Sequence, residues 1–204
     1  MTATDRELGE ELLSLGCATF NLDVSSPRSI ADFKAEFHDT KPLDVLLNIA
    51  GIMPTKEQDG INSVNLEVLN KTFAVNTFGP LLLTQALLPN LRASEHPKIG
   101  IMSSRVGSIA DNSSGCGYAY RASKAAVNCI GKTLSVDLKN EGLLAPVILM
   151  HPGFVKSGLD PATWQMDEAV MPEYAAGKLW KLFCDKGMED TGKFFHREGQ
   201  ELPW

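Results

Sequence analysis

Apolar residues along the chain fall into short runs that are separated by longer segments with helical spacing. The short runs end at Gly, Pro, Asn or Asp, so they predict buried strands. Segments in which apolar residues recur every three or four positions predict helices. Strands that alternate with helices are typical of an α/β protein whose parallel sheet is covered on both faces. The expected strands are residues 17–24, 43–48, 98–103, 145–150 and 192–196, and the expected helices are residues 4–15, 66–92, 118–140 and 173–185, with one more beginning at Ser26-Pro27.

Sheets of this kind bind their ligands beyond the carboxyl ends of the strands. We therefore expect the chemistry of the protein in the residues that directly follow the predicted strands. These are Asp23, residues 48–51, residues 103–104 and residues 152–157. The polar segment 104–117, rich in Gly and Ser, predicts a loop at the same edge.

Composition narrows the class of protein. The 204 residues favour one domain, and 44% hydrophobic with 22% charged residues is ordinary for a globular protein. The net charge of −6 comes without a block of like charge, which argues against a nucleic-acid partner. The four cysteines lack metal-ligand spacing, so we expect free thiols and no metal site. No apolar leader is present, and no apolar run approaches the roughly 18 residues of a membrane span, so we expect a cytoplasmic protein without membrane contact.

The sharpest candidate for chemistry is the pair Tyr120 and Lys124 in Tyr-Arg-Ala-Ser-Lys. Residues four apart share one face of a helix, so the phenol and the ammonium are able to point into one site. A tyrosine with an ordinary pKa near 10 is a poor base at neutral pH, and a neighbouring cation lowers that pKa. Taken alone, the same spacing is also typical of a solvated pair on a helix surface.

Further motifs surround this pair in a fixed order. They are Leu43–Gly51 (LDVLLNIAG), Phe73–Gly79 (FAVNTFG), Ile101–Gly107 (IMSSRVG) and Pro152–Ser157 (PGFVKS). The ordered set resembles the short-chain dehydrogenase/reductase family, from about residue 17 to the C-terminus. The runs SRVGSI and YRASKAAVN and the closing Gly-x-x-Leu-Pro-Trp are most similar to the C-factor-like branch of that family.

The resemblance implies a Rossmann-like, doubly wound parallel sheet in three αβα layers, and an oxidoreductase. Such an enzyme moves hydride between NADP(H) or NAD(H) and a small-molecule carbonyl/alcohol pair. Tyr120 matches the general acid/base, and Lys124 matches the residue that lowers its pKa and holds the nicotinamide ribose. Ser104 matches the residue that hydrogen-bonds the substrate oxygen, with Ser103 as its rival. Asn76 matches a residue that holds a water beside Lys124.

Cofactor contacts and assembly also follow from the resemblance. The family often packs the helices that match 66–92 and 118–140 against a second copy, which implies a possible homo-oligomer. Its adenine, ribose and nicotinamide contacts match, in chain order, Asp23 and Val24, then Asn48, Ala50 and Gly51, then Lys124, and finally Pro152, Gly153, Val155 and Ser157.

Each of these residues also has a purely structural interpretation. Ser104 is able to start a loop, and Asn76 is able to kink a helix. Asp23 is a suitable N-cap for the next helix. Gly51 and Gly153 suit backbone turns whether or not they contact a ligand.

The chain departs from the family pattern in two places. Ile49 replaces an amide in the family's Asn-Asn-Ala-Gly, with the loss of any hydrogen bond that the amide made. The Thr-Gly-x-x-x-Gly-x-Gly turn, which places the cofactor pyrophosphate on a helix N-terminus, is not in the sequence. We therefore interpret residues 1–204 as a single truncated domain with an incomplete sheet, in which dinucleotide binding is in question.

An incomplete sheet affects the expected strand 17–24. Two strands of the family would lie between it and strand 43–48, and their loss leaves a gap near 14 Å at about 4.8 Å per strand spacing. We expect residues 17–24 to close the gap and pair with residues 43–48. The alternatives are that the segment detaches, or that another chain fills the gap.

Three functional hypotheses remain open on the sequence. The first is the oxidoreductase described above. The second is a redox-neutral enzyme, such as a dehydratase, isomerase or cyclase, that uses Ser104, Tyr120 and Lys124 without a dinucleotide. The third is a non-catalytic protein that retains the family fold.

Overall fold

The computed structural model describes residues 3–38 and 41–204 of the chain. Its helices and strands alternate as expected for an α/β protein, and the class is confirmed. The helices are α1 (Ala3–Ser14), α2 (Pro27–Phe37), α3 (Leu66–Phe73), α4 (Gly79–Arg92), α5 (Tyr118–Asn140) and α6 (Pro172–Asp185). The strands are β1 (Val45–Asn48), β2 (Lys98–Met102), β3 (Val147–His151) and β4 (Lys193–His196).

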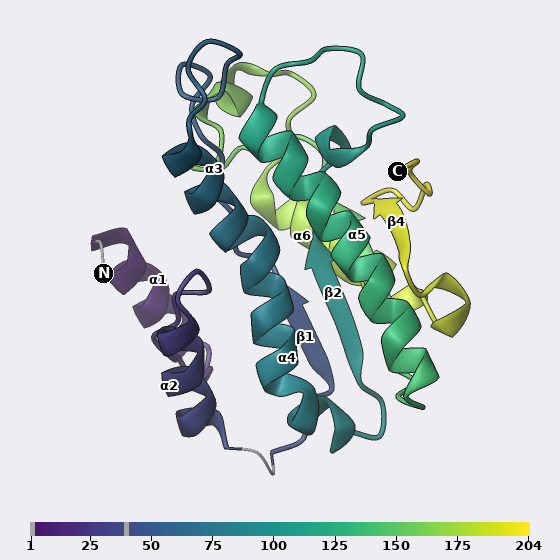
Figure 1. The fold of residues 1–204 in the computed structure, drawn as a ribbon. Helices are drawn as coiled ribbons and strands as arrows, with labels where there is room; N and C mark the ends of the chain where they lie inside the picture. The colour runs from purple at the N-terminus through teal and green to yellow at the C-terminus, as the bar shows by residue number, and fades with distance from the viewer. Residues whose placement is uncertain (1–2, 39–40) are drawn as a thin grey trace.

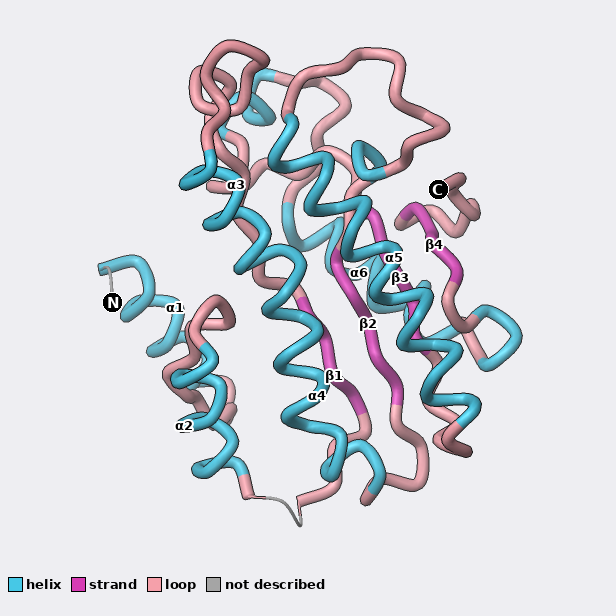
Figure 2. Tube along the Cα trace, in the orientation of Figure 1, coloured by secondary structure: helices cyan, strands magenta, loops and turns pink. Residues whose placement is uncertain are grey.

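The four strands form one parallel sheet in the order β1-β2-β3-β4 (Figure 2). Each strand pairs with the next along the chain, for example Leu46 with Ile99 and Leu149 with Phe194. Because all strands are parallel, their carboxyl ends meet at one edge of the sheet. The segments that follow β1, β2 and β3 therefore start close together.

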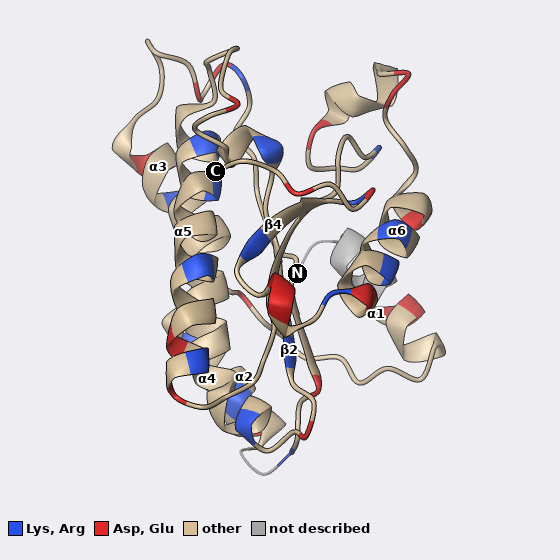
Figure 3. Ribbon diagram, turned by 90° about the vertical axis from the view of Figure 1, so that its right-hand side faces the viewer, with Lys and Arg blue, Asp and Glu red and all other residues tan. Residues whose placement is uncertain are grey.

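Helices cover both faces of the sheet, which confirms the expected three layers (Figures 1 and 3). On one face, α4 and α5 bury Leu91 and Val127 against Ile99 of β2. On the other face, α6 buries Phe183 against Ile148 of β3. Neighbouring residues of a strand point to opposite faces, which is why a sheet buried on both sides reads as a continuous apolar run.

The expected strand 17–24 is wrong, and so is its pairing with residues 43–48. Residues 17–23 form no regular structure, and among the described residues β1 has a strand neighbour on one side only. Phe20 instead packs edge-on against Phe33 and Phe37 of α2, at ring-centroid distances of 5.3 and 6.1 Å. A strand needs a hydrogen-bonded neighbour, and this segment lies against a helix instead.

The expected helix 66–92 is interrupted. A π-helical turn, Ala74–Phe78, separates α3 from α4. Such turns widen the helix by one residue and occur often at functional sites. The turn carries Asn76, so the interpretation of this residue as a source of helix distortion is consistent with the structure. The bounds of α5, in contrast, are those that the apolar spacing predicts.

Two surface features bear on earlier expectations. All four cysteines are free, as expected, and the structure shows that all four are exposed. In the segment 66–92, which the resemblance places against a second copy, Phe78 and Leu81 are exposed whereas Leu83 belongs to the core. Among the described residues, no helix is both long and apolar enough to cross a membrane.

Candidate active site

The structure brings the hydroxyls of Ser104 and Tyr120 together. Ser104 lies two residues beyond the end of β2, and Tyr120 lies in the first turn of α5. The Ser104 hydroxyl lies near the Tyr120 phenol and acts to lower its pKa. Ser103, the rival for the same role, is 2% exposed and donates instead to Asn128 Oδ1, at 2.5 Å. The two hydroxyls at 104 and 120 are therefore the pair that a carbonyl oxygen is able to meet.

Lys124 lies one turn after Tyr120, on the same face of α5. Its side chain is buried, and its Nζ donates to the carbonyl oxygen of Met102 at 3.0 Å. The Nζ is 5.8 Å from the centre of the Tyr120 ring. Burial lowers the pKa of Lys124 to about 8, because the interior disfavours the charged form.

The pKa of the Tyr120 phenol is raised, whereas we expected it to be lowered. Burial raises the pKa of Tyr120 to about 12, the Ser104 hydroxyl opposes this rise, and the Asp160 carboxylate adds to it. In the protein alone, burial outweighs the effect of the neighbouring groups on this pKa. The lowering that we expect from Lys124 together with the bound cofactor stays a prediction. A phenol that stays protonated at neutral pH is suited to donate a proton.

Asn76 links the loop after β1 to helix α5. Its Oδ1 accepts from the Ile52 amide at 2.8 Å, and its Nδ2 donates to the Ile52 carbonyl at 2.8 Å and to Ser123 Oγ at 3.1 Å. A methyl group added at Gly51 would lie 3.4 Å from Asn76 Oδ1 and 3.6 Å from Lys124 Nζ. The absence of a side chain at Gly51 thus leaves space above the amide and the ammonium.

The Asn48 side chain does not face the same space. Its Nδ2 donates to Thr84 Oγ1 of α4 at 3.2 Å, and the residue is 6% exposed. The following residues, Ile49 and Ala50, are exposed. Any contact of Asn48 with a ligand would therefore use its backbone.

Asp23 and Val24 lie in the turn before α2. The Asp23 carboxylate accepts from the backbone amide and the hydroxyl of Ser25, at 2.9 and 2.6 Å, which lowers the pKa of Asp23. The alternative that Asp23 caps α2 is wrong, because Ser26 accepts from the Ser29 amide and is the cap. The backbone oxygen of Val24 would lie 2.9 Å from a methyl group at Gly79, so this turn packs directly on the start of α4.

The segment after β3 is held by a residue that follows the neighbouring strand β4. Arg197 follows β4, and its Nη1 donates to the carbonyl oxygens of Pro152 and Phe154. Gly153 between them has a φ of +70°. Farther along, Val155 pairs with Val170, and the Ser157 hydroxyl accepts from the Leu159 amide at 3.3 Å. These contacts order a segment that begins at the carboxyl end of β3.

Gly107 allows the loop after β2 to contact α5. A methyl group at Gly107 would lie 2.7 Å from Lys124 Cβ and 2.9 Å from the Ala125 amide nitrogen, distances at which atoms must move apart. Gly107 closes the short 3₁₀ helix Arg105–Gly107 that begins directly after Ser104. The position of the Ser104 hydroxyl therefore depends on this contact.

We expect Gly107→Ala to lower the free energy of unfolding by about 2 kcal/mol, because the added methyl group overpacks the contact between the loop and α5. Urea unfolding measures the change. Gly158→Ala is the matched control, because a methyl group there meets nothing within 4 Å. Equal unfolding midpoints for the two variants would show that the loop gives way without strain.

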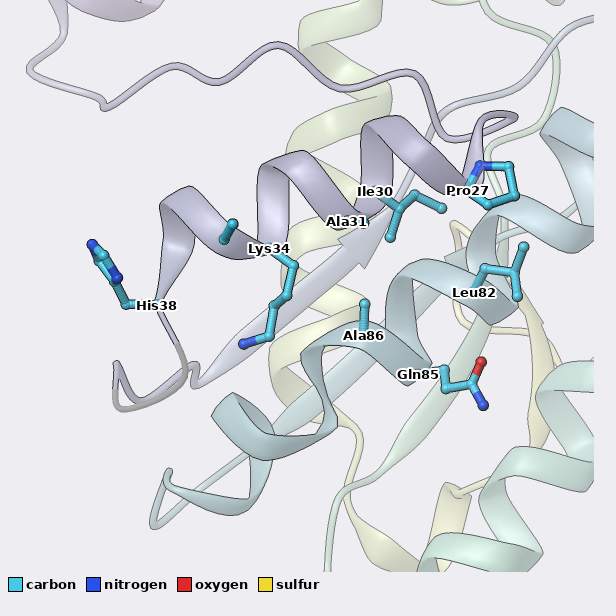
Figure 4. A pocket seen from close by; sticks show the side chains of 9 residues that line it. Pro27, Ile30, Ala31, Lys34, His38, Leu82, Gln85 and Ala86 are labelled. Carbon is cyan, nitrogen blue, oxygen red and sulfur yellow. The ribbon is translucent and has the colours of Figure 1, made fainter.

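A separate cavity of about 600 Å³ lies between α2 and α4 (Figure 4). Ile30 and Ala31 of α2 face Leu82 and Ala86 of α4 across it. None of the residues around Ser104, Tyr120 and Lys124 lines this cavity. The chemistry of the protein is therefore to be sought at the carboxyl edge of the sheet. In the part of the chain that the structure describes, no group of His, Cys, Asp and Glu is placed to hold a metal ion.

The family model of the short chain dehydrogenases matches residues 1–168. The chain belongs to the short-chain dehydrogenase/reductase family. It is 35% identical over 184 residues to the 1-hydroxy-2-glutathionyl-2-methyl-3-butene dehydrogenase of Rhodococcus sp. (strain AD45), covering 90% of this chain and 78% of that relative. It is also 35% identical over 165 residues to C-signal of Myxococcus xanthus, covering 81% of this chain and 95% of C-signal. The expected likeness to the C-factor branch is confirmed by this second relative.

The solved structures agree with the fold of this short-chain dehydrogenase/reductase. The NADPH-bound carbonyl reductase from chicken fatty liver superposes with a TM-score of 0.85 at 27% identity, over 100% of this chain and 84% of that one. The expected Rossmann-like, incomplete doubly wound sheet is therefore confirmed as a four-stranded version of the family fold.

A dinucleotide fits part of this short-chain dehydrogenase/reductase site. Gly51 lies beside the buried Lys124 Nζ and the Asn76 amide oxygen, polar groups that are suited to hydrogen-bond the hydroxyls of a nicotinamide ribose. The chain holds no Thr-Gly-x-x-x-Gly-x-Gly turn for the pyrophosphate. The residues present thus fit the nicotinamide end of the cofactor and provide no counterpart for its phosphates.

Two residues with contacts at this site received no role from the sequence. Asp59 is buried against the start of α5, and Arg197 holds the carbonyls around Gly153. Neither lies in a motif or at a helical spacing from a catalytic residue, so no local signal marks them. Only the paths of the loops bring them to the site.

Proposed function

We propose that the protein is a reductase of small carbonyl compounds that uses NADP(H) or NAD(H). The observation that carries this proposal is the placement of the Ser104 hydroxyl beside the Tyr120 phenol, with the Lys124 ammonium buried one turn below. Two neighbouring hydroxyls are suited to bind a carbonyl oxygen. The name of the chicken relative, a carbonyl reductase with bound NADPH, supports the same reaction class.

A nicotinamide cofactor held beside Lys124 and Gly51 would supply hydride to the carbonyl carbon. Ser104 orients the carbonyl oxygen by a hydrogen bond. Tyr120 donates its proton to the same oxygen as negative charge develops there, so that the product is an alcohol. The Lys124 ammonium, close to the Tyr120 ring, stabilises the phenolate that this transfer leaves.

The remaining residues of the proposed site hold the cofactor. Lys124 and Gly51 would contact the nicotinamide ribose. Asn76 would position the loop after β1, which contains Gly51, through its bond to Ile52. Residues that we place at the other cofactor contacts are Asp23, Val24, Asn48 and Ala50 toward the adenosine, and Pro152, Gly153, Val155 and Ser157 toward the nicotinamide.

Titration with NADPH and with NADH tests the proposal directly. We expect the fluorescence of the reduced nicotinamide to change on binding, and its absorbance at 340 nm to fall when a ketone or aldehyde is added. A panel of aliphatic and aromatic carbonyl compounds is the appropriate set of substrates. A folded protein that neither binds nor oxidises either cofactor would contradict the proposal.

The match to C-signal favours a second candidate, a non-catalytic signalling role. The match covers 95% of C-signal, so that relative extends little beyond the segment that it shares with this chain. The name of that relative denotes a signal, so we propose a signalling role for this chain as the second candidate. A folded protein that lacks cofactor binding would favour this candidate over the reductase.

A further inference from the structure

Asp59 lies in the loop between β1 and α3 and is 3% exposed. Its Oδ1 accepts from the backbone amide of Ala119 at 2.7 Å, and its Oδ2 accepts from the backbone amide of Tyr120 at 3.0 Å. Its backbone oxygen accepts from the Gly117 amide at 3.1 Å. One residue thus satisfies three amides at the start of the helix that carries the proposed acid.

The start of α5 has no cap of its own. The first amides of a helix lack partners within the helix and are usually satisfied by a Ser, Thr, Asp or Asn directly before it. Here that position is Gly117, which has a φ of +67° and no side chain. A carboxylate is a favourable replacement, because the helix dipole stabilises negative charge at the N-terminus. Asp59 is therefore a cap supplied by a distant loop.

The same loop is attached to α5 at a second point. Asn76 bonds both Ile52 of this loop and Ser123 of α5. Near the start of the loop, Gly51 lies beside Lys124 Nζ. Farther along the loop, the Asp59 carboxylate accepts from the Tyr120 amide. The loop and the first two turns of α5 are thus held together at both ends of the proposed site.

The partner of the Tyr120 phenol is held independently of Asp59. Ser104 directly precedes the 3₁₀ helix Arg105–Gly107, which packs on α5 at Lys124 through Gly107. That contact lies one turn beyond the amides that Asp59 caps. Loss of the Asp59 carboxylate would therefore loosen the first turn of α5, with Tyr120 in it, while the contact of Gly107 with Lys124 keeps Ser104 and Lys124 in place. The bond from Arg121 to the Val106 carbonyl, at 3.1 Å, is a second contact of this loop with α5.

We propose that Asp59 is a positioning residue, whose carboxylate fixes the first turn of α5 so that the Tyr120 phenol meets the Ser104 hydroxyl. The catalytic consequence rests on the proposed reductase function. The structural consequence does not, because it concerns only the surroundings of the phenol. The two are therefore tested by separate measurements.

The test replaces the carboxylate by Asp59→Asn and follows the titration of Tyr120. The chain has three tyrosines, and Tyr118 and Tyr174 are exposed. Burial raises the pKa of Tyr120 to about 12, and this value identifies its titration among the three tyrosines. We expect Asp59→Asn to lower the pKa of Tyr120 toward its ordinary 10.0, because a loosened first turn admits water, and burial affects this pKa more than the Ser104 hydroxyl does. Ultraviolet absorbance of the tyrosinate, or NMR of labelled tyrosine, measures the shift.

Turnover supplies the second measurement. We expect kcat for carbonyl reduction to fall about tenfold to a hundredfold, as for a small misplacement of a reacting group, with the KM for the cofactor unchanged. Asp59→Glu, which keeps the carboxylate, is expected to retain a pKa nearer to 12 and more of the activity. If the wild type shows no turnover, the reductase proposal fails while the tyrosine titration still decides the role of Asp59.

Asn65→Ala is the matched control, because Asn65 caps α3 from the same loop by accepting from the Val68 amide at 3.1 Å. We expect this variant to leave the pKa of Tyr120 and kcat unchanged. An equal shift in both variants, or none in Asp59→Asn, would overturn the proposal. If Asp59→Asn does not fold, hydrogen exchange of the wild type decides: the Ala119 and Tyr120 amides must be strongly protected, and fast exchange of both would overturn it.

Discussion

Tyr120→Phe is expected to lower kcat for carbonyl reduction by about 10² to 10⁴-fold, because it removes the proton donor of the proposed reaction. Phenylalanine fills the same volume, so the first turn of α5 and its amide bonds to Asp59 remain. Consumption of NADPH at 340 nm measures the rate, and the KM for NADPH is expected to stay unchanged.

The chain offers a closely matched control for this variant. Tyr118 lies two residues earlier on the same helix and is 44% exposed. Tyr118→Phe removes the same atom from solvent-exposed surface, so we expect wild-type turnover. A Tyr120→Phe variant with wild-type turnover would mean that solvent or another group donates the proton, and the assignment of the acid would be wrong.

Lys124→Met is expected to lower turnover and to raise stability at the same time. The variant removes the cation beside the Tyr120 ring, so the phenolate left by proton transfer loses its stabilising charge. Burial of that cation also destabilises the folded protein, as the lowering of the pKa of Lys124 from 10.5 to about 8 shows. Methionine fills the space without a charge. After loss of the bond to the Met102 carbonyl, we expect a net gain of about 2 kcal/mol in the free energy of unfolding at pH 7.

The pH dependence of this gain follows from linkage. The pKa of Lys124 is lower in the folded state than in the unfolded state, so the unfolded state binds more protons between about pH 8 and 10.5. The wild type therefore gains stability as the pH rises through this window, while below pH 8 its disadvantage stays constant. The excess stability of Lys124→Met is thus largest at pH 7 and shrinks by pH 10.

Urea unfolding at pH 7 and at pH 10 measures the gain and its pH dependence. Lys132→Met, which removes an exposed lysine two turns later on α5, is the control and is expected to change neither stability nor turnover. A Lys124→Met variant that is less stable than the wild type at pH 7 would show that the bond to Met102 outweighs burial of the charge.

The two predictions together describe the state of the site before a ligand binds. The phenol is protonated and the ammonium is buried. Burial raises the pKa of the phenol and lowers the pKa of the ammonium, so it favours the neutral form of both groups. A site in this state is prepared to give a proton to a carbonyl oxygen rather than to take one from an alcohol. Comparison of the rates of ketone reduction and alcohol oxidation at pH 7 would show the bias.

The sequence by itself determined the features that arise from local patterns. Apolar runs and helical spacing predicted four of the five expected strands and the bounds of α5, because these signals depend only on residues that are close in the chain. The spacing of Tyr120 and Lys124 predicted a shared helix face, and the motif order predicted the family. Both predictions are properties of short segments, so they needed no knowledge of how the segments pack.

The tertiary structure decided what depends on residues far apart in the chain. Residues 17–24 became no strand because their neighbours in space are the aromatic rings of α2 and not the edge of β1. Burial, which is a property of the whole fold, set the direction of the pKa of Tyr120, against the expectation from its charged neighbour. Asp59 reaches the start of α5 from about sixty residues away, and no pattern along the chain records such a contact.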